Sequence, residues 1–342
     1  MSKQVLVTGG TGYIGSHTVV ELQAAGFRVV IADNLSNSNI EVLDAIQKIS
    51  GVRPDFENVD LADKLATDSF FDKYPDIDAI IHFAAFKAVG ESVQKPLEYY
   101  HNNLNSLLNL LGNMLRYNIR NMVFSSSCTV YGQPDKLPVT EQTPRKPAES
   151  PYGNTKAICE DILRDFCHAN AGFNCIALRY FNPIGAHPSA LIGELPLGVP
   201  NNLVPFITQT AAGIRNELSI FGDDYATPDG TAIRDYINVV DLSGAHVVAI
   251  NRLIQDKQKA NYEFFNVGTG TGLSVMQLVK SFIAVTGVQL PYKIAPRRAG
   301  DIEKIWADTS FANEELGWKA SRATEETLLS AWNWEKSVRG IN

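Results

Sequence analysis

The first half of the chain alternates short apolar runs with longer segments of helical spacing. The runs predict strands at residues 4–9, 27–33, 55–60, 79–85 and 121–127. The segments that begin at Ser16, Ile40, Ala62 and Ser92 are predicted to be helices. Because strands and helices alternate, we expect a parallel, doubly wound sheet with helices on both of its faces.

One of these helical segments, at residues 101–118, is unusually rich in leucine. Apolar residues recur there at spacings of three and four, at Leu104, Leu107, Leu108, Leu111 and Leu115. This spacing predicts a long helix with one buried stripe that contains all five leucines.

The regular alternation of predicted strands and helices ends after about Asn182. A connection rich in proline and glycine follows at 183–202, and shorter strand-like and helical pieces come after it. We therefore predict a first domain at residues 1–182, with a return strand between 236 and 270. Residues 183–342 are predicted to form most of a smaller α/β domain that binds the substrate.

Composition and charge narrow the classes of function. The chain has 342 residues, of which 45% are hydrophobic and 20% charged, and its net charge is -7. An acidic globular protein is not expected to bind nucleic acid or acidic membranes broadly, although a local basic pocket for an anion stays open. The start lacks a signal-peptide pattern, and no apolar run is long enough to span a membrane. The four cysteines form no CxxC pair, so we expect a reducing, cytoplasmic setting without a metal site.

A glycine-rich loop joins the first predicted strand to the first predicted helix. Gly9, Gly12 and Gly15 allow a tight turn and a close approach of backbone to a pyrophosphate at a helix N-terminus. Asp33 ends the second predicted strand, where a carboxylate accepts hydrogen bonds from ribose hydroxyls and repels a 2'-phosphate. An ordinary tight turn is the alternative, but the flanking elements favour a Rossmann-type domain that binds NAD rather than NADP.

The stretch "SPYGNTKAIC" places Tyr152 four residues before Lys156. With 12 tyrosines and 30 basic residues in the chain, about one such pair is expected by chance as helical neighbours, and one is found. The spacing alone therefore decides nothing. Chemically, a lysine ammonium one turn away lowers the pKa of a tyrosine, which is about 10 when unperturbed. Ser127, at the end of the fifth predicted strand, is positioned to share the proton, the alternative being a satisfied strand-end hydroxyl.

The motifs "TGGTGYIGSH", "DNLSNS", "HFAAFKAVGES", "SSSCTVYG", "SPYGNTK", "RYFNPIGAHP", "FGDDYATPDGTAIRDYI" and "RRAGD" span almost the whole chain. Together they closely resemble the extended short-chain dehydrogenase/reductase family, and within it the enzymes that epimerise UDP-hexoses at carbon 4. The resemblance implies that Tyr152, Lys156 and Ser127 are catalytic and that tightly bound NAD accepts and returns a hydride at carbon 4. It also implies a homodimer formed through the helices that begin near Ser92 and Tyr152.

The resemblance assigns further residues to the two ligands. Those expected around NAD are Tyr13, Ile14, Asp33, Asn34, Asn37, Ser38, Asp60, Leu61, Phe83, Ala84, Lys87, Asn102 and Tyr180, besides the glycines and the catalytic pair. Those expected around the UDP-sugar, besides Ser127 and Tyr152, are Asn182, Asn202, Leu203, Phe221, Arg234, Arg298, Asp301 and Ile305. Strand-end packing, turn capping and surface ion pairs are the structural alternatives for several of these residues.

Three positions refine the expected chemistry. Related 4,6-dehydratases carry an acidic pair after the catalytic Ser or Thr, whereas this chain has Cys128 and Thr129, so dehydration is disfavoured. Ile305 stands where some relatives carry a bulky Tyr and others a small residue. We therefore predict interconversion of UDP-galactose and UDP-glucose, with UDP-N-acetylhexosamines as additional substrates. The alternatives are another UDP-sugar enzyme, such as a uronate epimerase or decarboxylase, and an inactive NAD-sensing regulator.

Overall fold

The computed structural model describes residues 2–298 and 301–341, and its centre is a parallel sheet of seven strands. The strand order is β10-β6-β5-β4-β1-β2-β3, and every pairing in it is parallel. The strands are β1 (Gln4–Thr8), β2 (Arg28–Asp33), β3 (Asp55–Asn58), β4 (Ala79–His82), β5 (Asn121–Ser127), β6 (Asn174–Tyr180) and β10 (Tyr262–Val267). The predicted Rossmann-type α/β fold is confirmed, and the order reverses between β1 and β4, where such sheets bind ligands.

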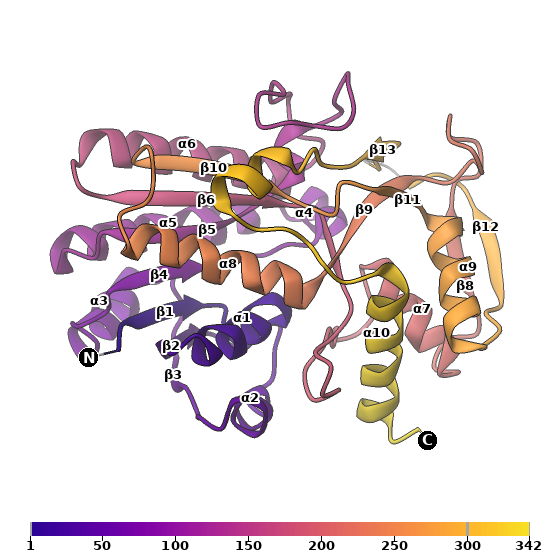
Figure 1. Ribbon diagram of the computed structural model, residues 1–342, viewed down its shortest axis with the longest axis horizontal. Coiled ribbons are helices and arrows are strands. Elements are labelled where there is room, and N and C mark those ends of the chain that lie inside the picture. The colour runs from indigo at the N-terminus through magenta and orange to yellow at the C-terminus, as the bar shows by residue number, and fades with distance from the viewer. Residues whose placement is uncertain (1, 299–300, 342) are drawn as a thin grey trace.

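Helices cover both faces of this sheet (Figure 1). One face packs on α1 (Tyr13–Ala24), α2 (Val42–Ser50) and α8 (Val239–Ile254). The other packs on α3 (Lys64–Lys73), α5 (Pro96–Tyr117) and α6 (Pro151–Ala169). Alternate residues of the strands, such as Val123 and Phe124 of β5, enter opposite cores, which explains why the strands are apolar throughout.

The predicted helix that begins near Ser92 is instead two helices, α4 (Val89–Gln94) and α5, so this expectation was wrong. Lys95 separates them with φ -129° and ψ 53°. The proline ring at position 96 disfavours helical geometry in the residue before it, but its own fixed φ suits the first position of a new helix.

The predicted stripe of α5 is only partly buried. Leu107 and Leu111 are buried, but Leu108 and Leu115 are 49% and 48% exposed. The buried stripe is completed by Leu110 and Met114, and lies about 70° around the helix from the predicted one, at 3.6 residues per turn. The prediction failed because leucine spacing marks every apolar side of a helix, including one that does not face the protein's own core.

The remaining elements form a smaller α/β region beside the sheet. Its elements are β7 (Asn182–Ile184), α7 (Leu203–Ala211), β8 (Leu218–Phe221), β9 (Ile233–Asn238), β11 (Gly272–Ser274), α9 (Val275–Thr286), β12 (Tyr292–Ala295), β13 (Lys304–Ile305) and α10 (Thr324–Arg339). Strand β9 pairs with β7, β11 and β13, and β8 pairs with β12. A separate core containing Ile207, Phe282 and Trp332 holds this region together.

The chain crosses between the two regions more than once. After β9 it returns through α8, which packs against α1, and through β10, which pairs with β6. Two short helical turns, η1 (Cys128–Tyr131) and a π-helical turn η2 (Ala312–Leu316), complete the described elements. The proposed division at residues 182 and 183 therefore stays a prediction about folding units, because later segments build part of the first region.

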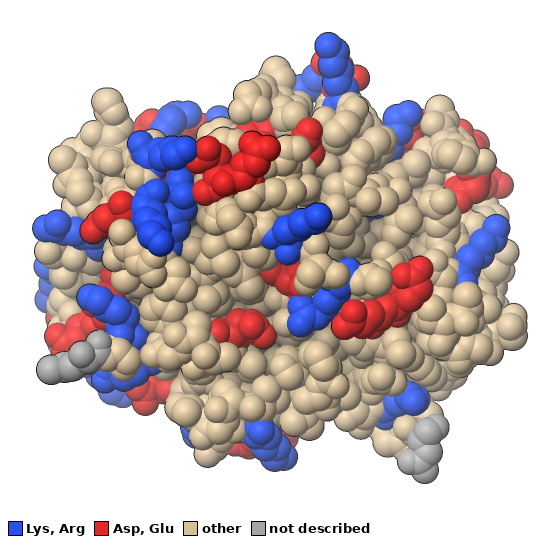
Figure 2. Space-filling view, in the orientation of Figure 1, with Lys and Arg blue, Asp and Glu red and all other residues tan. Residues whose placement is uncertain are grey.

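The surface carries charges of both signs. Figure 2 shows basic and acidic side chains interspersed on the face seen there, with no broad area of one sign. Within residues 2–298 and 301–341, no helix combines the length and apolarity needed to cross a membrane.

Candidate active site

The glycine loop forms a cradle between the end of β1 and the start of α1. Gly9 has φ +68°, and a Cβ built on it would lie 2.8 Å from the Ala84 backbone nitrogen. A Cβ on Gly15 would lie 2.2 Å from the Gly9 carbonyl oxygen. Gly12 is the N-cap of α1 and provides no side-chain cap, which leaves first-turn N–H groups available to an anion. These features fit the pyrophosphate of a dinucleotide.

Tyr13 and Ile14 open α1, which starts three residues before the predicted position. The Tyr13 hydroxyl donates to the Gly185 carbonyl oxygen at 2.6 Å, so it ties the loop to the segment that follows β7. Burial raises the pKa of Tyr13 well above its usual value, and nearby Glu194 adds to the effect. Tyr13 therefore acts as a neutral hydrogen-bonding group at the edge of the cradle.

Asp33 lies at the end of β2 with its carboxylate facing the glycine loop. It accepts hydrogen bonds from the backbone N–H groups of Thr11 (3.1 Å) and Leu35 (2.9 Å). Ser38, whose hydroxyl lies 2.7 Å from the Thr11 hydroxyl, completes the group. Asp33 is 8% exposed, and these backbone hydrogen bonds hold its carboxylate group in position.

The other residues predicted around NAD divide by location. Asn34 accepts a hydrogen bond from the backbone of Ser36, whereas Asn37 is exposed. Asp60 and Asn102 line one surface depression of about 630 Å³ beside Phe86, while Leu61 is buried in the core.

Phe83 and Ala84, both predicted near NAD, follow β4 and lie directly beside Gly9. The Phe83 ring packs on His246 with centroids 4.7 Å apart, so part of its role is packing. Lys87 lies further along this loop, with Nζ 6.0 Å from the Tyr13 ring centre and 3.6 Å from Glu194. The loop thus places an ammonium group beside the start of α1.

The three predicted catalytic residues meet at the carboxyl end of β5. Ser127 ends the strand, and Pro151 opens α6 so that Tyr152 and Lys156 lie one turn apart on one side of the helix. Lys156 is 4% exposed, and its Nζ donates to the Ser125 carbonyl oxygen at 2.7 Å. Its Nζ lies 6.0 Å from the centre of the Tyr152 ring.

The electrostatics of this trio differ from the simplest expectation. Burial raises the pKa of Tyr152 to about 12, and a hydrogen bond with Ser127 only partly opposes it. Burial lowers the pKa of Lys156 to about 8, opposed by its neighbours Cys159 and Glu160. The polypeptide's own groups therefore leave Tyr152 protonated at neutral pH and Lys156 mostly charged.

Tyr180 lies directly beside this trio on β6, where it pairs in register with Ser127. Its hydroxyl contacts the hydroxyl of Ser125, the residue that also accepts from Lys156. Burial raises the pKa of Tyr180, so it serves as a neutral donor or acceptor.

The residues predicted around the UDP-sugar come from the smaller region. Arg234 on β9 donates to the Ile233 carbonyl oxygen and pairs in register with Ile305 of β13. Arg298 forms an exposed ion pair with Asp301 and lies 5.5 Å from the Phe221 ring centre. The intervening Ala299 and Gly300 lie outside the described residues. An exposed pair of this kind contributes little to stability.

The connection between β7 and α7 supplies the rest of that group. Asn182 opens β7, and Leu203 is the first residue of α7. Asn202, the N-cap of α7, donates from Nδ2 to Glu194 Oε1 at 2.5 Å. Ile305 is buried in a cluster with Cys128, the residue after Ser127, which places it against the catalytic end of β5.

Sequence reasoning missed several residues that hold the site. Glu194 contacts both Lys87 and Asn202, so it links the two expected ligand regions. Thr11 fixes Asp33 and Ser38, and its place inside the glycine motif was a signal that was overlooked. Glu194 gave no such signal, because its partners are far from it in the chain.

Comparisons with known proteins agree with this geometry. Residues 6–330 match the family model described as GDP-mannose 4,6 dehydratase. The UDP-glucose 4-epimerase of Bacillus subtilis is 50% identical over 333 residues, which cover 97% of each protein.

Two solved structures of UDP-glucose 4-epimerases each superpose with a TM-score of 0.94 and cover 99% of this chain and 100% of theirs. The protein from Stenotrophomonas maltophila is 45% identical and has bound NAD and formylated UDP-arabinopyranose. The protein from Bifidobacterium longum is 44% identical and is in complex with NAD+ and UDP. With relatives this similar over nearly its full length, the chain belongs to the UDP-glucose 4-epimerase family of the extended short-chain dehydrogenase/reductases.

Proposed function

We propose that this protein interconverts UDP-galactose and UDP-glucose, with NAD held at the glycine cradle. The observation that carries the proposal is the meeting of Ser127, Tyr152 and Lys156 at the end of β5, in a chain that belongs to this family. Neither a uronate enzyme nor an inactive sensor is favoured by the relatives. Dehydration is also disfavoured, because Cys128 and Thr129 provide no carboxylate after Ser127.

The chain offers a specific set of groups to NAD. The first-turn amides of α1 would hold the pyrophosphate, Asp33 would accept from the adenosine ribose, and Lys156 would donate to the nicotinamide ribose. Bound NAD supplies a reversible hydride acceptor for carbon 4 of the sugar, so that the hydroxyl can be rebuilt on the opposite face.

Tyr152 is the proposed base for the sugar 4-hydroxyl. Bringing its pKa from about 12 to neutrality requires about 7 kcal/mol of preferential stabilisation of the phenolate. Ser127 contributes a hydrogen bond, and the Lys156 ammonium contributes positive charge beside the ring. In the return step Tyr152 gives the proton back to the sugar oxygen, so one catalytic cycle neither takes up nor releases a proton.

The substrate's diphosphate needs cationic donors in an acidic protein. Arg234 and Arg298 supply guanidinium groups in the smaller region. Tyr225 lies within electrostatic range of Arg234 and of Asp301, and Asp301 is the ion-pair partner of Arg298. The two arginines therefore belong to one part of the smaller region. Phe221, 41% exposed next to Arg298, offers an aromatic face for uracil. These contacts stay proposals for the substrate side.

Turnover without added cofactor tests the function. Purified protein incubated with UDP-galactose should form UDP-glucose, and the matched Tyr152→Phe variant should retain NAD but lose nearly all turnover. Conversion at a wild-type rate by Tyr152→Phe would contradict the proton-transfer role. Absence of conversion by the wild-type protein loaded with NAD would contradict the function itself.

The substrate range depends on the position of Ile305. Its burial against Cys128 supports the idea that it limits the space beside the catalytic end of β5. A residue of intermediate size is proposed to admit UDP-N-acetylhexosamines as well as UDP-hexoses. Conversion of UDP-N-acetylglucosamine at high enzyme concentration is expected, and its absence contradicts this part of the proposal alone.

The exposed side of α5 supports a homodimer. Leu97, Leu108 and Leu115 are 81%, 49% and 48% exposed, and with half-buried Leu104 they follow one another at spacings of seven and four. Such spacing makes a continuous apolar stripe along one side of a helix. We propose that a second copy of this chain covers it.

The cysteines support a reducing compartment. Cys128, Cys159, Cys167 and Cys175 are all free and buried. Free cysteines are usual where glutathione keeps thiols reduced. They agree with the proposal that the protein works in the cytoplasm.

A further inference from the structure

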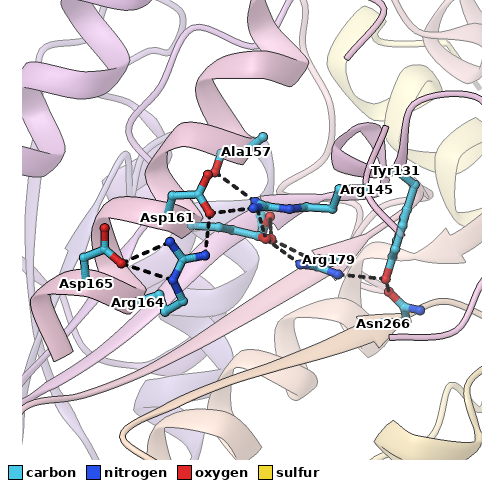
Figure 3. A network of polar contacts seen from close by, with 10 residues as sticks. Tyr131, Arg145, Ala157, Asp161, Arg164, Asp165, Arg179 and Asn266 are labelled. Carbon is cyan, nitrogen blue, oxygen red and sulfur yellow. Dashed lines mark hydrogen bonds and ion pairs between the residues drawn. The ribbon is translucent and has the colours of Figure 1, made fainter. Parts of the chain in front are cut away.

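A buried polar network lies directly behind the catalytic residues. Arg179 of β6 donates from Nε to Glu160 Oε1 at 2.8 Å and from Nη2 to Oε2 at 2.5 Å. Figure 3 shows Arg179 reaching on its other side to Tyr131, which in turn meets Asn266 of β10. The two charged side chains are 5% and 2% exposed, so the pair is almost fully removed from water.

Stability alone does not explain this pair. Taking both charges out of water costs several kcal/mol each, and replacing a buried pair by apolar residues is often neutral or stabilising. A pair of this kind is better explained by what it holds in place, which here is β5, the strand that ends in Ser127.

Helix α6 is attached to β5 at two consecutive residues. Lys156 Nζ donates to the Ser125 carbonyl oxygen at 2.7 Å, and the Ser126 hydroxyl donates to Glu160 Oε1 at 2.5 Å. Side chains alternate along a strand, so Ser126 points toward the middle of α6 at the residue just before Ser127. Besides the hydrogen bond of Tyr152 with Ser127 at the start of the helix, Ser126 therefore gives α6 a second side-chain hold on the end of β5.

The spacing on α6 makes the same connection. Tyr152, Lys156 and Glu160 lie four residues apart and so occupy one side of the helix. A slide or rotation of α6 that weakened the Ser126–Glu160 bond would also move Tyr152 relative to Ser127. Because Arg179 grips both carboxylate oxygens of Glu160, it fixes this register.

We propose that the Glu160–Arg179 pair is a positioning element of the active site, which sets the register of α6 on β5 through Ser126 and keeps a negative charge beside Lys156. The inference rests on the proposed function, because Ser127, Tyr152 and Lys156 are its catalytic residues. In the proposed function Glu160 and Arg179 touch neither NAD nor the UDP-sugar. They act only through Ser126 and Lys156.

The charge of Glu160 has a second consequence. Lys156 is faced by Cys159 and Glu160 on its own helix, by His82 on β4 and by Tyr152. Glu160 is faced by Arg179 and, at 3.6 Å, by Arg145. Burial lowers the pKa of Lys156 to about 8 and Glu160 works against it, so removal of the carboxylate charge should let Lys156 lose its proton at lower pH.

Three variants separate positioning from charge. Ser126→Ala cuts the link to β5 and keeps the ion pair, Glu160→Gln removes the charge with little change of shape, and Glu160→Leu with Arg179→Met replaces the whole pair by apolar groups. Arg164→Ala, which removes two exposed ion pairs on the same helix, is the matched control. Melting temperature and NAD content are measured for each.

We expect kcat for UDP-galactose to fall about tenfold, which is about 1.4 kcal/mol, in all three variants, with KM within about twofold and the control unchanged. The basic limb of the kcat profile should move to lower pH in Glu160→Gln and in the apolar pair, but not in Ser126→Ala. Wild-type kcat and an unshifted limb in the apolar pair overturn the proposal. The proposal is also overturned if kcat falls only in proportion to the melting temperature and the basic limb of the kcat profile does not move.

A measurement without turnover keeps this inference separate from the function. The Cε chemical shift of Lys156 in lysine-labelled protein, assigned with Lys156→Arg, reports its titration directly. We expect the midpoint of Lys156 at a lower pH in Glu160→Gln than in wild type, and no change in Ser126→Ala. Equal midpoints in Glu160→Gln and wild type overturn the electrostatic part even if the protein acts on another sugar nucleotide.

Discussion

Lys156 gives the sharpest prediction, because it is a buried charge among the three proposed catalytic residues. It is 4% exposed, and burial lowers its pKa from the ordinary value of 10.5 to about 8. A downward change of this size means that burying the charged amine costs about 3 kcal/mol of folding free energy. The perturbation is Lys156→Met, which keeps a long unbranched side chain and removes the charge.

The sign of the pH effect follows from proton counting. Below pH 8 the amine is protonated in both the folded and the unfolded protein, so the cost of burial is fully present at pH 7. Between pH 8 and about 10.4 the folded protein has released the proton and the unfolded chain still holds it. Stability of the wild type therefore rises with pH across this window, by about 2 kcal/mol between pH 7 and 9.5 relative to Lys156→Met.

Unfolding by denaturant at pH 7 and at 9.5 measures this difference. Each protein is compared at equal NAD content, and the free energies of unfolding are subtracted at each pH. Loss of the Lys156 hydrogen bond to Ser125 costs the variant about 1–3 kcal/mol, but this term does not depend on pH and cancels. A difference that stays constant between the two pH values, or that moves in favour of the variant, would refute the reasoning.

Three further predictions concern the glycine loop, the surface and the pH profile. Gly15→Ala should abolish NAD retention, because its Cβ would lie 2.2 Å from the Gly9 carbonyl oxygen; Gly112→Ala, with nothing within 4 Å, should keep NAD and the melting temperature. Leu108→Glu should raise the dimer dissociation constant by tenfold or more in analytical ultracentrifugation, which is about 1.4 kcal/mol, while Leu65→Glu on α3 should not; equal effects would contradict the proposed interface. The kcat of the wild type should fall as pH rises through about 8, where Lys156 loses its charge, and a profile flat to pH 10 would contradict that role.

The parts of the fold that depend on local pattern were predictable. The five strand runs and the glycine loop are encoded within a few residues each, and the strands were found where expected. The errors came where the pattern was ambiguous: leucine spacing could not tell the core side of α5 from its exposed side. The break at Lys95 had a local cause in Pro96, which was visible in the sequence and was not used.

The parts of the site that depend on contacts between distant segments were not predictable from spacing. The assignments around Ser127, Tyr152 and Lys156 came from a family resemblance, and the structure adds the distances between them. Glu160 and Arg179 were missed because their relationship crosses from α6 to β6, and nothing in either segment marks the other. Glu194 was missed for the same reason, since Lys87 and Asn202 are brought to it only by the fold.

The two buried charges at α6 have opposite effects on the same helix. Lys156 destabilises the folded protein at neutral pH because its charged amine is held away from water, whereas the proposed mechanism uses this charge to stabilise a phenolate at Tyr152. Glu160 reduces that cost for Lys156, but it is itself tolerable only because Arg179 binds both of its oxygens. Each charge therefore makes the next one necessary, and the series ends at β6, deep in the sheet. An apolar substitution of Glu160 alone or of Arg179 alone should lower stability more than joint replacement of the two, because a single change leaves a buried charge without its partner.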